Sequence, residues 1–313
     1  MKYVESINQS LLELLQNDSR VYLLGEDILD PYGGAFKATK GLSTAFPGRV
    51  LTTPISEAGI VGMAIGMAMR GLRPIVEIMF GDFLTLAADQ IINSACKFPW
   101  MYNGQVEVPI VIRAPMGGYR GYGPTHSQTL ETLFLNVPGL TIVAPSILHD
   151  VGRLLKEVVT TAPGPVLFIE NKSLYATEMD NGKRTYSFGD VCISKQTKGS
   201  ADITIIAYGG MTSLAIKASE ELLLRDEIEA NVVSPFQIKP LPDFPEIKTP
   251  IVIVEETQSE FGWGAEVGLR FRDLPSTRVG AKPTPIPASR NLEQQTLPQV
   301  NDIVMAAKRL LNV

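Results

Sequence analysis

The sequence predicts an α/β fold with two domains. Short apolar segments rich in β-branched residues alternate with segments whose apolar residues recur at helical spacing, as in parallel sheets covered by helices on both faces. The chain has 313 residues, which is roughly two domains' worth. A polar stretch poor in aliphatic residues, 176–190, separates the halves. We therefore predict domains at residues 1–180 and 187–313.

The elements of the first domain follow one another in a regular order. An opening helix is predicted within residues 3–20, because Val4, Ile7, Leu11 and Leu14 recur at helical spacing. Segment 108–115 is rich in β-branched residues and predicts a strand. The other predicted strands are 21–27, 74–80, 139–146 and 164–171, and the other predicted helices are a short one within 32–50, then 57–69, 82–98 and 147–159.

The second domain repeats the alternation with fewer elements. Three apolar segments predict strands and two amphipathic segments predict helices. The strands are 201–210, 229–235 and 249–257, and the helices are 212–224 and 297–313.

Composition excludes several classes of protein. The net charge of −5 leaves no basic surface for nucleic acid. The uncharged apolar runs 59–69 and 203–216 are shorter than the about 20 residues that a membrane span needs. The N-terminus lacks a signal-peptide core, and Cys96 and Cys192 show no CxxC spacing. We therefore expect a soluble cytoplasmic protein without disulfides.

Glu57 is the first candidate functional residue. An acid in the first turn of a helix is favoured by the helix dipole by about 0.3–1 kcal/mol, which is one explanation for it. However, residues 58–69 carry no charge, and Gly59, Gly62 and Gly66 share one helical face that another backbone could approach closely. We expect a buried carboxylate, which must be hydrogen-bonded, paired or protonated. A raised pKa would let it give a proton to a ligand nitrogen.

The two histidines lead to different expectations. His126 follows a glycine-rich loop beyond a predicted strand, so a structural and a catalytic role are about equally supported. His149, in the first turn of a predicted helix, reads as a surface residue with no role. Two histidines make a His-rich metal site unexpected, and we assign no metal ligands.

Two glycine patterns carry less functional weight. The segment GYRGYG, residues 118–123, departs from the dinucleotide-binding fingerprint and does not open a helix. The segment AYGGMTS, residues 207–213, is a strand–glycine–helix turn. Such a turn can bind an anion, but we favour a packing role there.

Taken together, these segments resemble the beta subunit of the thiamine-diphosphate-dependent, decarboxylating component of 2-oxo acid dehydrogenases. The resemblance covers nearly the whole chain in the right order. It implies a pyrimidine-binding domain with a parallel sheet, followed by a transketolase C-terminal-type α/β domain. The matching stretches are LLGEDI, YGGAFKATKGL, TPISEAGIVGMAIGMAMRGLRPIVEIMFGDF, DQIINSACK, VPIVIRAPMGG, HSQ, PGLTIVAPS, ITIIAYGGM, IKPLPD and FGWGAEVG.

The resemblance also implies a cofactor and partners. An alpha subunit would complete an α2β2 heterotetramer, with thiamine diphosphate between an alpha and a beta subunit. The GDG motif that holds the diphosphate and its divalent metal is missing from this chain. The resemblance therefore implies that Mg²⁺ is bound on the alpha side. A lipoyl acyltransferase core is a further implied partner, and the substrate would be a small 2-oxo acid.

Five residues match functional positions of the family. Glu57 matches the glutamate that bonds the aminopyrimidine ring nitrogen and favours its imino form. Ile55 and Met79 match positions lining the pyrimidine pocket, and Phe83 matches an aromatic position against that ring. His126 matches a histidine at the reactive end, where it would assist proton transfer or acyl transfer to lipoamide.

The implied function is decarboxylation of a 2-oxo acid followed by acylation of lipoamide, and two alternatives stay open. One is the C-terminal half of a split transketolase acting on sugar phosphates, which the scarcity of histidines disfavours. The other is a non-catalytic scaffold subunit. The shortened helix after FGWGAEVGLRF and Gln237, where arginine is common, allow a scaffold. The intact set of Glu57, Phe83 and His126 disfavours it.

Overall fold

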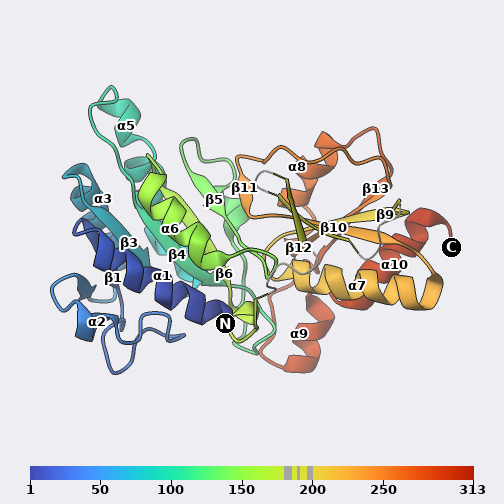
Figure 1. Ribbon diagram of the computed structural model, residues 1–313, viewed down its shortest axis with the longest axis horizontal. Helices are drawn as coiled ribbons and strands as arrows, with labels where there is room; N and C mark the ends of the chain where they lie inside the picture. The colour runs from blue at the N-terminus through green and yellow to red at the C-terminus, as the bar shows by residue number, and fades with distance from the viewer. Residues whose placement is uncertain (180–184, 189–190, 196–199) are drawn as a thin grey trace.

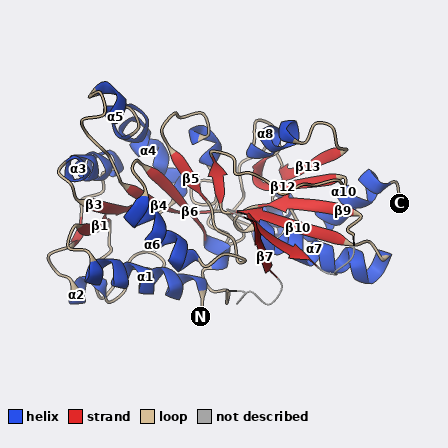
Figure 2. Ribbon diagram, turned by 45° about the horizontal axis from the view of Figure 1, so that its top comes forward, coloured by secondary structure: helices blue, strands red, loops and turns tan. Residues whose placement is uncertain are grey.

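The chain forms two sheets arranged end to end, each with helices on its faces (Figure 1). The computed structural model describes residues 1–179, 185–188, 191–195 and 200–313. Figure 2 shows strands in the middle of each half and helices outside them. The predicted two-domain α/β architecture is confirmed. Within the described ranges, no helix combines the length and the apolar character needed to cross a membrane.

The first sheet has seven strands in the order β11-β5-β6-β4-β3-β1-β2. Strands β1 to β6 are mutually parallel, and β11 runs antiparallel to β5. All five strands predicted in the first domain are present, whereas β2 and β11 were not predicted. Their bounds are β1 Val21–Gly25, β2 Val50–Thr52, β3 Arg73–Glu77, β4 Val111–Met116, β5 Thr141–Val143, β6 Val166–Asn171 and β11 Gln237–Lys239.

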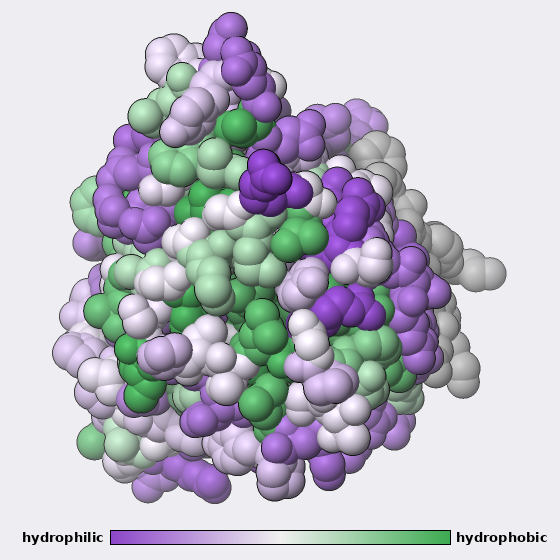
Figure 3. Space-filling view, turned by 90° about the vertical axis from the view of Figure 1, so that its left-hand side faces the viewer, coloured by the Kyte–Doolittle hydropathy of each residue, from purple (hydrophilic) through white to green (hydrophobic). Residues whose placement is uncertain are grey.

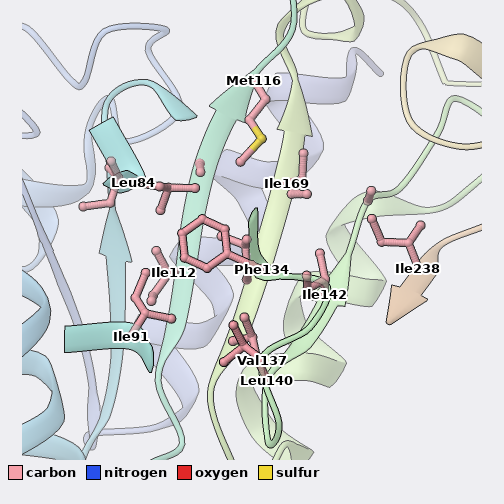
Figure 4. Close-up of a cluster of buried hydrophobic side chains, with 14 of the residues drawn as sticks. Leu84, Ile91, Ile112, Met116, Phe134, Val137, Leu140, Ile142, Ile169 and Ile238 are labelled. Atoms are coloured by element: carbon pink, nitrogen blue, oxygen red, sulfur yellow. The ribbon is translucent and has the colours of Figure 1, made fainter. Parts of the chain in front are cut away.

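Helices cover both faces of this sheet because both faces are apolar. Residues of α1 and α6 pack on one face, and those of α3 and α4 pack on the other. Figure 4 shows part of the core on the α3 and α4 face, which extends across the sheet from Leu84 through Ile142 to Ile238 of β11, a strand from the second half of the chain. The bounds are α1 Tyr3–Asn17, α2 Leu42–Ala45, α3 Glu57–Met69, η1 Gly81–Phe83, α4 Leu84–Asp89, η2 Gln90–Ala95, α5 Phe98–Met101, η3 Glu131–Phe134, α6 Val151–Thr161 and η4 Lys172–Leu174.

The second sheet has six strands in the order β13-β12-β9-β10-β8-β7. Strands β13, β12, β9 and β10 are mutually parallel. Strand β8 pairs antiparallel with β10, and β7 pairs antiparallel with β8. Part of the predicted domain boundary, 180–184 and 189–190, lies outside the described residues. The bounds are β7 Thr185–Phe188, β8 Val191–Lys195, β9 Ile203–Ala207, β10 Ala230–Pro235, β12 Ile251–Gln258, β13 Ser276–Ala281, α7 Met211–Asp226, α8 Trp263–Arg270, α9 Arg290–Thr296 and α10 Val300–Leu311.

A buried arginine connects three neighbouring strands of the first sheet. Arg113 on β4 donates to Glu77 on β3 at 2.7 Å and to both carboxylate oxygens of Glu170 on β6 at 2.6 and 2.9 Å. Its side chain is fully buried, and both carboxylates are at least 96% buried in side-chain terms. Because an unpaired buried charge is costly, each member of this group depends on the others.

The prediction that His149 lies at the surface is wrong. The residue is only 5% exposed, and its ring meets Phe236 at 5.7 Å between centroids. Its Nδ1 accepts the backbone N–H of Ser146 at 2.9 Å. Burial lowers the pKa of His149 to about 4. Phe236 lies between β10 and β11, so the covering segment comes from a distant part of the chain that local periodicity cannot reveal.

Candidate functional site

The candidate functional residues lie beyond the carboxyl ends of parallel strands in the first sheet. Glu57 follows β2, Met79 and Phe83 follow β3, and His126 follows β4. Because the spatial order is β4-β3-β1-β2, these ends lie along one edge of the sheet. Ligands of open α/β sheets bind at this edge.

Glu57 lies near a second acid, Glu26, at the carboxyl ends of β1 and β2. It is the first residue of α3 and is 6% exposed, so its predicted burial is confirmed. Glu26 follows β1, and burial raises the pKa of Glu26, as does the negative charge of Glu57. A hydrogen bond with the backbone of Ser56 lowers the pKa of Glu26. Oε1 of Glu26 is buried without a hydrogen-bond partner among the described residues. The signal for Glu26 was an acid directly after a buried strand.

The helix behind Glu57 is buried on one face only. Ile60, Val61 and Ile65 are among its residues that pack on the sheet, and Met63 is 45% exposed. A Cβ atom at Gly66 would meet nothing within 4 Å. The described residues therefore cover the glycine face only in part, because Gln90 lies against Gly62 while Gly66 stays exposed.

The second group of candidates is a cluster of rings around His126. The imidazole meets the ring of Phe80 at 4.7 Å and that of Phe83 at 5.3 Å, both edge to face. Phe80 also meets Tyr122 at 6.0 Å. The fold therefore brings Phe83 and His126 together, as predicted for one site. Ile55, by contrast, is a largely exposed residue, because its side chain is 84% exposed.

Two polar contacts hold the His126 loop against this cluster. The buried Lys172, directly after β6, donates to the carbonyl of His126 and lies 5.0 Å from the centroid of the Phe80 ring. Gln128 donates to Asp82 at 2.9 Å, which ties the loop to the turn that carries Phe83. Burial lowers the pKa of Lys172 to about 8. Lys172 was missed because its sequence neighbours show only that it follows a strand.

The glycine-rich loop after β4 packs closely against the second domain. Gly121 and Gly123 have positive φ angles of 73° and 80°. A Cβ atom at either residue would lie 3.1–3.3 Å from Ala288. Tyr119 in the same loop donates from its hydroxyl to the carbonyl of Pro298 at 2.8 Å. The glycines of GYRGYG therefore allow the loop to approach the second domain closely.

The turn between β9 and α7 also serves packing. A Cβ atom at Gly210 would lie 2.6–2.7 Å from the side chain of Asn171, so only glycine fits. Asn171 donates to Glu256 at 2.7 Å, and Glu256 also accepts the backbone N–H of Gly118. Burial raises the pKa of Glu256 to about 7. These contacts join the two domains directly behind the His126 loop.

Metal-binding side chains do not gather anywhere in the part of the chain that the structure describes. No group of three or more His, Cys, Asp or Glu side chains there could hold a metal ion. The acids at the sheet edge, Glu26 and Glu57, form only a pair.

Comparisons with known proteins agree with this architecture. Residues 1–178 match the family model "Transketolase, pyrimidine binding domain", and residues 194–303 match "Transketolase, C-terminal domain". Among solved structures, the fold is similar to a split gene transketolase in the form of an inactive beta4 tetramer. The TM-score is 0.75 and the identity 23%, over 98% of this chain and 97% of that one.

Curated relatives are more similar in sequence. The chain is 38% identical to subunit beta-2 of the mitochondrial pyruvate dehydrogenase E1 component from Oryza sativa subsp. japonica, over 97% of this chain and 85% of that protein. It is 35% identical to the corresponding beta subunit from Rattus norvegicus, over 99% and 90% of the two chains. The chain therefore belongs to the transketolase-like family of 2-oxo acid dehydrogenase E1 beta subunits.

Proposed function

We propose that this chain is the beta subunit of a thiamine-diphosphate-dependent 2-oxo acid dehydrogenase of the acetyl-transferring, pyruvate dehydrogenase type. With an alpha subunit, it decarboxylates a 2-oxo acid and acylates lipoamide. The observation that carries the proposal is the pair of neighbouring carboxyl groups, the partly buried Glu26 and the buried Glu57, at the same sheet edge as the ring cluster of Phe83 and His126. The curated relatives support the same reaction class.

The residues at this edge fit the pyrimidine half of thiamine diphosphate. Glu26 favours retention of a proton, because its partial burial and the negative charge of Glu57 both raise its pKa. The unpartnered oxygen of Glu26 and the buried carboxyl of Glu57 are suited to a ring nitrogen that exchanges protons. Phe83, Met79 and Ile55 would then contact the ring, with offset stacking on Phe83 contributing about 0.5–1.5 kcal/mol.

Each residue then has a defined task. When bound, thiamine diphosphate supplies the electron sink for the loss of CO₂. Glu57 holds the proton at the pyrimidine nitrogen. Nδ1 of His126 lies 2.9 Å from the hydroxyl oxygen of Thr125, which leaves Nε2 for proton transfer at the reacting end. Lys172 and Gln128 keep the His126 loop in place through the contacts described above.

The open face of the first domain supports an alpha subunit as partner. Figure 3 looks onto the end of the molecule that carries α3 and shows hydrophobic residues gathered across the middle of that face. Such a patch is typical of an interaction surface. We infer that the alpha subunit covers the glycine face of α3, binds Mg²⁺ and completes an α2β2 tetramer. Large hydrophobic side chains exposed in the first domain include Ile55, Met63, Leu86, Trp100, Met101 and Tyr102.

The acyl acceptor and the cellular location complete the proposal. A lipoyl acyltransferase core is part of the proposal, because acylation of lipoamide requires an acceptor. The cytoplasmic location stays a prediction from the sequence.

The substitution Glu57→Gln tests this function. The chain is co-expressed with a candidate alpha subunit, and 2-oxo-acid-dependent reduction of an artificial electron acceptor is measured. We expect Glu57→Gln to lower kcat by about 10²–10⁴-fold, the usual contribution of a general acid or base. Glu157→Gln on the exposed face of α6 is the matched control. Full activity of Glu57→Gln would show that the assigned role is wrong.

Assays on the same complex distinguish the proposed function from the split transketolase and the non-catalytic scaffold. A split transketolase would turn over sugar phosphates, and a scaffold would not bind thiamine diphosphate in a calorimeter. The likeness to the split transketolase concerns the fold, whereas sequence identity to the pyruvate dehydrogenase subunits reaches 38%. We therefore retain the 2-oxo acid reaction.

A further inference from the structure

A long groove follows the free edge of the second sheet. In the described part of the chain, β13 is the last strand of that sheet, and it lies at one margin of the second domain (Figure 2). The groove has a volume of about 1070 Å³ and lies between β13, α9 and α10. We call it the β13 groove.

The β13 groove runs along the edge of the strand and not over one face of the sheet. The consecutive residues Ser276–Gly280 all line it, although neighbouring side chains of a strand point to opposite faces. The backbone N–H of Ile251 on β12 donates to the carbonyl of Pro275 at 2.9 Å. Because backbone groups alternate in direction along a strand, the N–H and carbonyl groups of every second residue, beginning with Ser276, point away from β12. An extended peptide could pair with these groups, as in β-strand addition.

The opposite wall of the groove offers an apolar surface to one face of such a peptide. Met305 on α10 is 42% exposed and lines the groove together with Ala306 and Leu310. Strand β13 has six residues, which span about 20 Å at the usual rise of a strand. The groove therefore suits about six residues of extended chain, every second of which meets α10.

The charged side chains in the wall are mostly cationic. Arg278, Lys282 and Arg309 are exposed and line the groove. None of them forms an ion pair with another described residue. The one acid in the lining, Asp302, accepts the backbone N–H at the N-cap of α10 at 2.8 Å. The groove therefore carries a net positive charge, which favours an acidic occupant.

The same charges argue against a second copy of this chain as the occupant. Two identical edges would place their cationic side chains close to one another, and such juxtaposition is costly. Lysine and arginine on an edge strand usually prevent this kind of pairing. A chemically different partner fits the edge better.

We propose that the β13 groove binds an extended acidic segment of a partner protein, which adds to the second sheet as a strand beside β13. Main-chain hydrogen bonds to the edge supply affinity, and the cationic side chains select acidic residues. The inference does not depend on the proposed function, because the groove contains none of the residues assigned to the cofactor or the reaction.

The first experiment measures peptide binding to the full chain by fluorescence polarisation. The probe is a fluorescein-labelled peptide of about eight residues in which glutamate and valine alternate, long enough to cover β13. We expect saturable binding that weakens as salt is added. The matching lysine–valine peptide should not bind. Equal binding of the two peptides, or no binding of the glutamate–valine peptide, would overturn the proposal.

The second experiment separates strand addition from simple charge attraction. A fully N-methylated glutamate–valine peptide keeps its charge but has no backbone donors, so it should bind at least about tenfold more weakly. The double variant Lys282→Gln/Arg309→Gln should also weaken binding of the unmethylated peptide about tenfold. Lys40→Gln/Arg272→Gln, at exposed sites outside the groove, is the matched control and should bind like the unmodified chain. Undiminished binding of the N-methylated peptide, or undiminished binding to the groove variant, would contradict the proposal.

Sedimentation velocity tests the rival occupant. We expect the glutamate–valine peptide to leave the association state of the full chain unchanged. If the chain self-associates and the peptide separates the copies, a second copy occupies the edge, and the assignment to an acidic partner is overturned.

Discussion

The buried His149 should make the protein sensitive to acid in a way that one substitution removes. The imidazole is neutral in the folded chain, because burial lowers its pKa to about 4, whereas a histidine in an unfolded chain titrates near 6.5. Its Nδ1 accepts the backbone N–H of Ser146. His149→Asn retains an acceptor for that N–H and removes the titrating group.

The sign follows from the two pKa values. Below pH 6.5 the unfolded chain takes up a proton at His149 that the folded chain takes up only near pH 4. The folded state therefore loses stability as the pH falls through this window, and the contribution is complete below pH 4. For a pKa difference of this size, linkage gives about 2 kcal/mol between pH 7 and pH 5, and about 3 kcal/mol at most.

Urea unfolding followed by circular dichroism at pH 7 and pH 5 measures this effect. The stability of His149→Asn relative to the unmodified chain should rise by about 2 kcal/mol on going from pH 7 to pH 5. His126→Asn is the control, because His126 is only partly buried. If the free-energy difference between His149→Asn and the unmodified chain is the same at both pH values, the argument from burial is refuted.

Two further substitutions test the packing and the open face. Arg113→Met should cost about 3–5 kcal/mol of unfolding free energy in urea, because it leaves the buried Glu77 and Glu170 unpaired; a loss no larger than that of the exposed Arg153→Met would contradict this. Gly66→Leu should leave the monomer folded, since a Cβ atom there meets nothing within 4 Å, yet abolish co-elution with the alpha subunit in size-exclusion chromatography. Retained co-elution would show that the glycine face of α3 is not the interface.

Local sequence was sufficient to predict the central parallel strands of both sheets, because each is a short apolar run between turn signals, but it missed the parallel edge strands β2 and β13. It was not sufficient for β11, whose three residues, Gln237–Lys239, form a strand only because β5 offers an edge. The predicted helix 82–98 is instead a 3-10 turn, a short α-helix and a π-helical segment. In that segment Gln90 lies against Gly62 of α3, with its Oε1 3.2 Å from the position of a Cβ atom, a tertiary contact that periodicity does not encode.

Local sequence likewise predicted only part of the candidate site. Glu57, Phe83 and His126 were predicted because their motifs are contiguous, whereas the roles of Glu26 and Lys172 depend on neighbours that the fold supplies. Lys172 contacts the backbone of His126, which lies 46 positions away in sequence. The pKa of a buried group is set by such distant contacts, so composition and spacing predict where a charge lies more readily than how it titrates.

Under the proposed function, the unequal burial of Glu57 and Ile55 indicates which part of the site this chain forms by itself. This chain buries the carboxyl of Glu57 to 6% exposure by its own packing, while Ile55, two positions earlier, stays 84% exposed. The acid is therefore buried by this chain alone, and the surface around Ile55 is left open. A preformed acid on an open face implies that assembly with the alpha subunit would exclude water from a site whose proton-holding groups are already fixed. Loss of the partner should then abolish cofactor retention but leave the burial of Glu57 intact.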